Sequence, residues 1–167
     1  MANPLEQEEK LYQQIKTENI LVPPDTWRFI YQHIGNAVSV INLMSNYYVL
    51  IGEPMPVEVA KGILKFTQKI KQTLDCVLYP HQGVLDGDLF KQYRIENITL
   101  HPIIREMLKH YIGNDVFRIN LIAGDSVDPA GPQPVSIDNL YKIIDCTHSL
   151  KIFMDKLREA TCELVGF

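Results

Sequence analysis

The chain has 167 residues, of which 46% are hydrophobic and 22% charged, and its formal net charge is -4. This composition is typical of a globular protein that buries its own core. The mild negative charge and the lack of a basic run argue against nucleic acid as a partner. No apolar run reaches the roughly 18 residues of a membrane span, and the start shows no signal pattern. We therefore expect a cytoplasmic protein with no membrane partner.

The three cysteines, Cys76, Cys146 and Cys162, include no CxxC pair. Their odd number and their spacing favour neither a disulfide framework nor a zinc site. We expect Cys76 and Cys146 to be small buried residues.

The first part of the chain predicts a short amphipathic helix over residues 5–19 and, after two prolines, a long helix over residues 25–51. The long helix carries apolar residues at alternating steps of three and four. Such a pattern forms an apolar seam that needs a partner helix. The seam consists of Trp27, Ile30, Ile34, Ala37, Ile41, Met44, Tyr48 and Ile51.

A second seamed helix is predicted over residues 57–79, joined to the first by the short segment GEPMP. So short a connection makes the two helices antiparallel. Residues 25–79 are therefore predicted to form a helical hairpin, preceded by residues 1–24 as an N-terminal helix and linker.

Residues 80–167 are predicted to be a small α/β extension. A turn-rich linker over residues 80–88 leads to a strand candidate at 95–100, a helix at 101–112 and an alternating strand candidate at 116–123. A Pro/Gly-rich loop precedes a third long helix over residues 136–164. We recognise no internal repeat.

These elements predict a mainly α fold class. Three long seamed helices hold more apolar surface than one hairpin can cover, so the hairpin is predicted to form a dimeric four-helix bundle. The chain is thus expected to be a homodimer, with the small α/β element and the C-terminal helix beside the bundle.

The order of these elements resembles a sensor histidine kinase, in which a dimerisation hairpin precedes an ATP-binding domain. QHIGNAVSVI, residues 32–41, is similar to the family's H-box. Matching Asn36, Ser39 and Ile41 to their counterparts places Gln32 at the phosphorylated histidine and His33 at its acidic neighbour. The resemblance implies that Gln32, His33, Asn36 and Ser39 form a face that binds a response regulator.

The second half is similar to the start of the ATP-binding domain. In the family, two asparagines of the N-box hold magnesium and phosphate, whereas the matched positions here are Cys146 and Leu150, which offer no hard oxygen ligand. No glycine-rich nucleotide box occurs in the sequence. The resemblance therefore implies a pseudokinase without a nucleotide cofactor, which acts in two-component signalling as a scaffold.

Two alternatives stay open. His33 is a candidate phosphoacceptor, with Asn36 and Gln32 as hydrogen-bond partners, which would make the chain a phosphotransfer protein. Glu106 and His110 stand at i and i+4, a spacing that suits a metal site or a helical enzyme, although no third ligand is spaced for it. Cys146 and His148 are two positions apart on a helix, so they point to different sides and form no catalytic pair.

Overall fold

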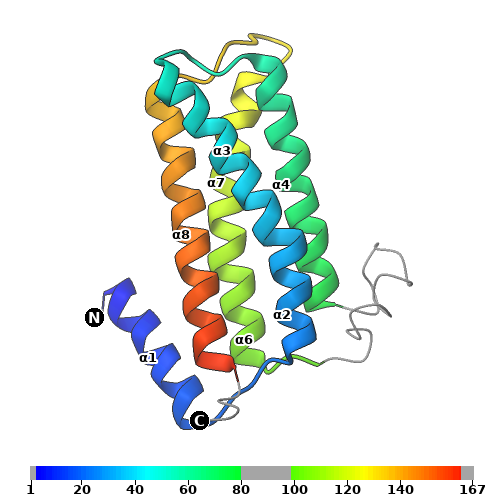
Figure 1. Ribbon diagram of the computed structural model, residues 1–167, viewed down its shortest axis with the longest axis vertical. Coiled ribbons are helices and arrows are strands. Elements are labelled where there is room, and N and C mark those ends of the chain that lie inside the picture. Colours follow the sequence, from blue (N-terminus) through cyan, green and yellow to red (C-terminus); the bar gives the residue numbers. More distant parts are fainter. Residues whose placement is uncertain (1–2, 80–98, 163–167) are drawn as a thin grey trace.

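The computed structural model describes residues 3–79 and 99–162. These residues form a bundle of four long antiparallel rods, with the short helix α1 (Pro4–Thr17) beside the lower end of α8 (Figure 1). The prediction of a mainly α fold is confirmed. The rods are α2 (Pro24–Ile30), η1 (Tyr31–Gly35) and α3 (Asn36–Ile51); α4 (Val57–Leu78); α6 (Pro102–Met107), η2 (Leu108–Ile112) and α7 (Gly113–Ser126); and α8 (Ile137–Thr161).

Local chemistry fixes where the helices begin and end. The Asn3 side chain accepts a hydrogen bond of 2.9 Å from the amide of Glu6 at the start of α1, and Ser136 caps α8 in the same way. Proline in the first turn starts α2 and α6, where its missing N–H is not needed. Gly52 ends α3 with a φ of 71°, a left-handed conformation that glycine adopts without steric cost.

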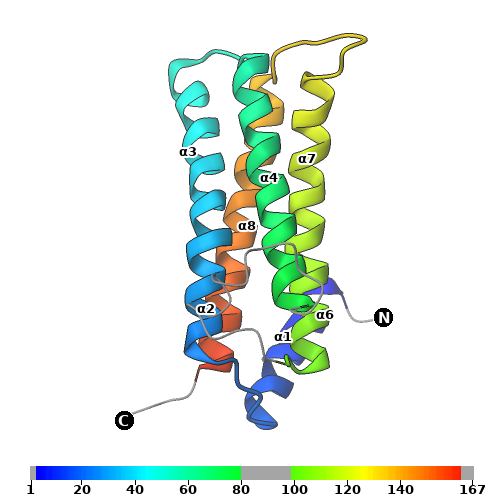
Figure 2. The same ribbon diagram turned by 90° about the vertical axis from the view of Figure 1, so that its right-hand side faces the viewer.

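The four rods share one hydrophobic core. The predicted seam of the first rod is buried from Trp27 to Ile41, but Ile51 is 46% exposed. The helices that cover the seam, α4 and α8, come from the same chain and lie beside the first rod (Figure 2). The expected four-helix bundle is therefore intramolecular, and the reason for predicting a dimeric bundle is removed.

The small α/β element is a further correction. The alternating segment at residues 116–123 lies inside helix α7 and not in a strand, because its apolar residues Val116, Ile119 and Ala123 also share one helical face and pack into the core. The other strand candidate, at 95–100, lies mostly outside the described residues. The division into a hairpin and an α/β extension is therefore replaced by two hairpins in one bundle.

The two hairpins are related by an internal sequence repeat, which we did not recognise in the sequence alone. IGNAVSVINL at residues 34–43 returns as IGNDVFRINL at residues 112–121, and each copy begins within a π-helical segment, η1 or η2. The next helices also correspond, with Thr67 of α4 matching Thr147 of α8. The second hairpin thus takes the place that we had assigned to a second chain.

Contacts across the bundle have the same repeat. Asn42 of α3 donates a hydrogen bond of 2.8 Å to Thr147 of α8, and the hydroxyl of Thr67 on α4 makes the matching bond of 3.0 Å to Asn120 of α7. Where the two hairpin turns meet, the backbones of Met55 and Val135 exchange two hydrogen bonds of 2.9 Å. Reciprocal pairs of this kind indicate an approximate two-fold relation between the hairpins.

The rod from Pro24 to Ile51 is long and apolar enough to cross a membrane by length and composition, contrary to our expectation from the sequence. A core helix of a soluble protein meets the same criterion, so this is weak evidence. Only 28% of its most apolar window is buried inside the bundle. Helix α3 therefore leaves much apolar surface uncovered.

Candidate docking site on α3 and α8

The outward side of α3 is apolar and carries no charge. Between Phe29 and Gly52 the sequence contains no Asp, Glu, Lys or Arg. Leu43 is 69% exposed, Tyr47 56% and Leu50 84%. Steps of three and four residues place these side chains on one side of the helix. We call this side the α3 face: Asn36, Val40, Leu43, Tyr47 and Leu50.

The second hairpin supplies an internal reference for the α3 face. In the repeat, Val40 of α3 corresponds to Arg118 of α7, and Tyr47 corresponds to Asp125. Both α7 residues are exposed. Since α3 and α7 occupy corresponding places in the bundle, the fold itself does not require apolar residues at positions 40 and 47 of α3.

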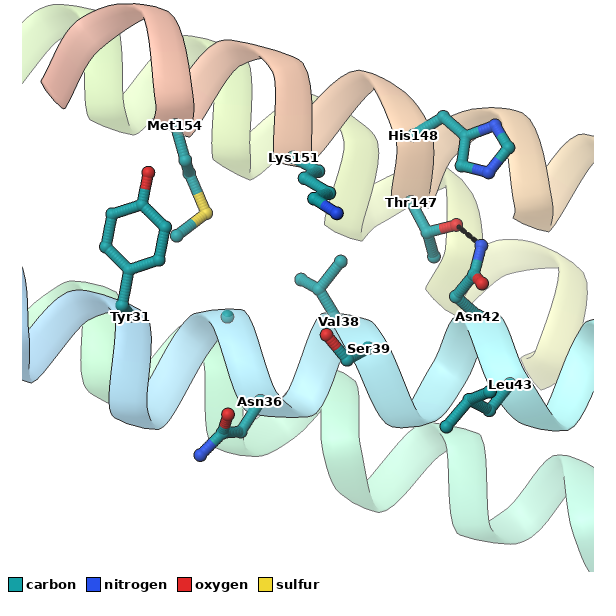
Figure 3. A pocket seen from close by; sticks show the side chains of 11 residues that line it. Tyr31, Asn36, Val38, Ser39, Asn42, Leu43, Thr147, His148, Lys151 and Met154 are labelled. Atoms are coloured by element: carbon teal, nitrogen blue, oxygen red, sulfur yellow. Dashed lines mark hydrogen bonds between the residues drawn. The ribbon is translucent and has the colours of Figure 1, made fainter. Parts of the chain in front are cut away.

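A groove of about 500 Å³ runs beside the α3 face, between α3 and α8 (Figure 3). Its floor is apolar, and polar side chains from both helices form its rims. It is lined by Tyr31, Gly35, Asn36, Val38, Ser39, Asn42, Leu43, Thr147, His148, Lys151 and Met154.

Hydrogen bonds fix both ends of the groove. The bond between Asn42 and Thr147 closes one end. At the other end, the Tyr31 hydroxyl donates a hydrogen bond of 2.6 Å to Asp155, and the Arg158 guanidinium lies 5.2 Å from the Tyr31 ring. Burial and the neighbouring Asp155 raise the pKa of Tyr31, so its hydroxyl stays protonated and keeps donating. The groove is therefore held open by contacts within the bundle.

Lys151 is the one charged side chain among the described residues that line the groove. Figure 3 shows it pointing from α8 into the groove, on the side that faces Val38. The nearest acid one turn along α8, Asp155, is engaged by Tyr31. None of the ion pairs found within residues 3–79 and 99–162 involves Lys151. The groove thus presents a cation on an apolar floor.

The four predicted partner-binding residues separate into two sets. Asn36 and Ser39 are exposed and line the groove, and Gln32 is exposed one turn before them. His33 lies on the other side of the rod, half-buried with its ring centroid 4.7 Å from that of Phe29. Burial, with the positive charge of Lys69 on α4, lowers the pKa of His33. The structure therefore places His33 away from the groove.

Glu106 and His110 line a different groove, between α1 and the α6–η2 segment. Within the described residues they are not part of any group of three metal-ligating side chains. The ring nitrogens of His110, which is exposed, lie 3.4 to 3.5 Å from the Asn114 amide nitrogen. The polar contact of His110 that the structure shows is therefore with Asn114, one turn along the helix, and not with Glu106.

Cys146 and His148 diverge, as predicted from their spacing. Cys146 is buried, and desolvation raises the pKa of its thiol, whereas His148 is exposed on the rim of the groove. The sequence patterns identified neither His148 nor Lys151 as a site residue. Comparison of the two hairpins could have identified His148, because the first hairpin has Gln68 at the corresponding position, but not Lys151, which corresponds to Lys71.

Comparisons of the chain with protein-family models, curated proteins and solved structures find no match. The resemblance to histidine kinases therefore rests only on the order of the elements and on the H-box-like segment at residues 32–41. The fold, the α3 face and the groove rest on contacts within the chain. That geometry is the basis for assigning a function.

Proposed function

We propose that this protein is a non-catalytic interaction module, a cytoplasmic scaffold that binds a partner protein on the α3 face and the adjoining groove. The observation that carries the proposal is the difference between two copies of one helix. Helix α7 has charged residues Arg118 and Asp125 where α3 has Val40 and Tyr47. An exposed apolar patch that packing does not require is typical of a protein interface.

The composition of the site favours a protein partner over a lipid bilayer. Aromatic and apolar side chains at the centre with polar side chains at the rim are the usual anatomy of an interface. Helices that lie on membranes normally flank their apolar side with Lys or Arg, and the α3 face has neither. Because one chain completes the bundle, we propose that the docking unit is the monomer.

The partner class that we propose is a response regulator. Its support is the resemblance of residues 32–41 to the H-box, since Asn36 and Ser39 of that segment line the groove. Binding would be by occupancy alone, with no bond made or broken, so that the scaffold sequesters or positions the regulator.

A titration of purified receiver domains from the source organism tests this proposal. We expect at least one domain to bind wild-type protein saturably, and Tyr47→Asp to weaken the binding by about tenfold or more, the effect of losing a central aromatic contact. Leu121→Asp, which places the same charge at an exposed apolar position of α7, is the control and should bind like wild type. Equal loss in both variants, or no receiver domain that binds, would refute the regulator as partner.

A second candidate function is phosphoryl acceptance, and the repeat moves it from His33 to His110. In the second copy, His110 and Asn114 stand where Gln32 and Asn36 stand in the first. His110 is exposed, and the Asn114 amide nitrogen lies 3.4 to 3.5 Å from its two ring nitrogens. His33 is half-buried between helices and lacks this access.

Incubation with phosphoramidate, a small phosphoryl donor, separates the two histidines. This second proposal predicts an acid-labile phosphate on wild-type protein and on His33→Gln, and none on His110→Gln. A label that survives in His110→Gln would exclude His110 as the acceptor. A label-free wild type would leave only the scaffold.

A further inference from the structure

We propose that the groove between α3 and α8 is an anion site that takes a carboxylate side chain of the docked partner, held between Lys151, His148 and Ser39. This inference rests on the proposed docking function and adds the chemistry of the partner: an apolar helical segment that carries one acidic residue. A fatty acid would present the same group, a carboxylate on an apolar chain, but the ligand that we assign is a segment of a protein.

Charge complementarity is the first argument. Lys151 extends over an apolar floor that includes Val38 and Met154, the latter only 2% exposed (Figure 3). It is not part of any ion pair found in the described residues. The Lys151 side chain is itself exposed, so its ammonium group is accessible to a negative group that enters the groove from solvent.

The rims supply the remaining hydrogen bonds that a carboxylate needs. His148 and Lys151 are one turn apart on α8, so both side chains lie toward the same side of that helix. Ser39 stands on the opposite rim, on α3, with its hydroxyl available as a donor. No Asp or Glu occurs among the described residues that line the groove. A carboxylate there meets donors on both sides and no like charge.

The second hairpin indicates that this groove is specific and not a by-product of the fold. Lys71 of α4 corresponds to Lys151, but Gln68 corresponds to His148 and the bulky Phe117 to Ser39. The small Ser39 therefore leaves one groove open to a ligand, whereas the other copy carries an aromatic ring at the corresponding position. The repeat provides matched controls for each groove residue.

A second copy of this chain is a less suitable occupant. A symmetric dimer on this surface brings like surfaces together, and α3 carries no carboxylate to offer to Lys151. A lipid surface is disfavoured for a related reason, since helix α3 itself has no Lys or Arg and Lys151 is the one such residue in the described lining of the groove. The cation in the groove therefore favours an acidic segment of a different protein.

Amide chemical shifts of the full chain, titrated with octanoate, test the site without knowledge of the partner. Octanoate should shift the amide signals of Ser39, Asn42, Thr147 and Lys151, and octylammonium should bind about two- to fivefold more weakly, the ratio expected for a partly exposed charge pair. Lys151→Gln should remove that preference, whereas Lys71→Gln should keep it. Ser39→Phe, which installs the residue of the other copy, should abolish the shifts.

Two results would overturn the inference. Equal binding of octanoate and octylammonium, or equal effects of the two lysine substitutions, would show that Lys151 does not select an anion. A gain of about fourfold in affinity for each added CH2 from hexanoate to decanoate would identify a lipid pocket instead. The titration with receiver domains does not depend on these results. Failure of the anion site is therefore distinguishable from failure of the docking proposal.

Discussion

Helices α3 and α7 occupy corresponding places in the bundle and share the pattern IGNxVxxINL, yet their outward sides differ. The α3 face carries Val40 and Tyr47 where α7 carries Arg118 and Asp125. Inward, both helices bury the same positions, such as Ile41 and Ile119, neither of which is exposed at all. What the two copies share on their inward sides is therefore required by the fold, and what differs outward on α3 is available for function.

The largest effect on partner binding is expected when the charged residues on the outward side of α7 are introduced at the corresponding positions of α3. The double variant Val40→Arg, Tyr47→Asp should bind its partner at least about tenfold more weakly, because desolvating charges opposes docking. Its free energy of unfolding should change by less than about 0.5 kcal/mol, as is usual at surface positions. Chemical denaturation measures the second quantity. A large loss of stability would mean that the α3 face serves the fold.

The next effect concerns the inward side of α7. Asp115 takes the place that Ala37 holds in the first hairpin, and burial raises the pKa of its carboxyl, although Ser149 and Arg118 act in the opposite direction. The ionised carboxylate therefore destabilises the fold at neutral pH. Asp115→Ala should stabilise the protein by about 1 kcal/mol at pH 7.

The pH dependence provides the control for Asp115. A raised pKa means that the folded protein binds the proton more tightly than the unfolded chain does. The gain from Asp115→Ala should therefore shrink as the pH falls through the raised pKa toward the ordinary value of 3.8. A gain that does not depend on pH would assign the effect to packing.

A comparable or slightly smaller gain is expected from Ser45→Ala. Ser45 is fully buried, and its hydroxyl has no hydrogen-bond partner among the described residues, while the second hairpin has Ala123 at this position. Removing an unsatisfied buried hydroxyl from a site shaped for alanine should raise the free energy of unfolding by about 1 kcal/mol. Thermal unfolding measures it, and a loss of stability would indicate that Ser45 has a partner.

The smallest effect is expected at His33, which the second hairpin replaces by Tyr111. Its lowered pKa means that the unfolded chain binds the proton more tightly. Stability from this group is fully present above the ordinary pKa of 6.5 and is lost as the pH falls below that value. His33→Gln should make the stability curve flatter between about pH 6.5 and 5 by a few tenths of a kcal/mol. An unchanged curve would contradict the lowered pKa.

Much of the fold could be predicted from the sequence because heptad spacing reports which side of a helix is buried. The helices at 25–51, 57–79 and 136–164 were predicted to within a few residues of their ends. The prediction for 116–123 was wrong because Phe117, Ile119 and Leu121 alternate like a strand, although Val116, Ile119 and Ala123 satisfy a helix. Short apolar stretches fit both periods.

The candidate site was predicted only in part. Asn36 and Ser39 were found through the H-box pattern, whereas His148 and Lys151 lie more than a hundred residues away in sequence and join them only in the folded bundle. Periodicity locates the core, but it does not say which two helices will be neighbours. The repeat contains that information, since a duplicated hairpin predicts that its copies pack together.

The central claim is that one chain completes its own bundle and leaves the α3 face for another protein. Photo-cross-linking in the source organism, with a benzoylphenylalanine placed at position 47 or at the matched position 125, tests it most directly. The account predicts a discrete adduct with a different protein from position 47 and none from position 125. Adducts of equal yield from both positions, or an adduct with twice the mass of the chain, would contradict it.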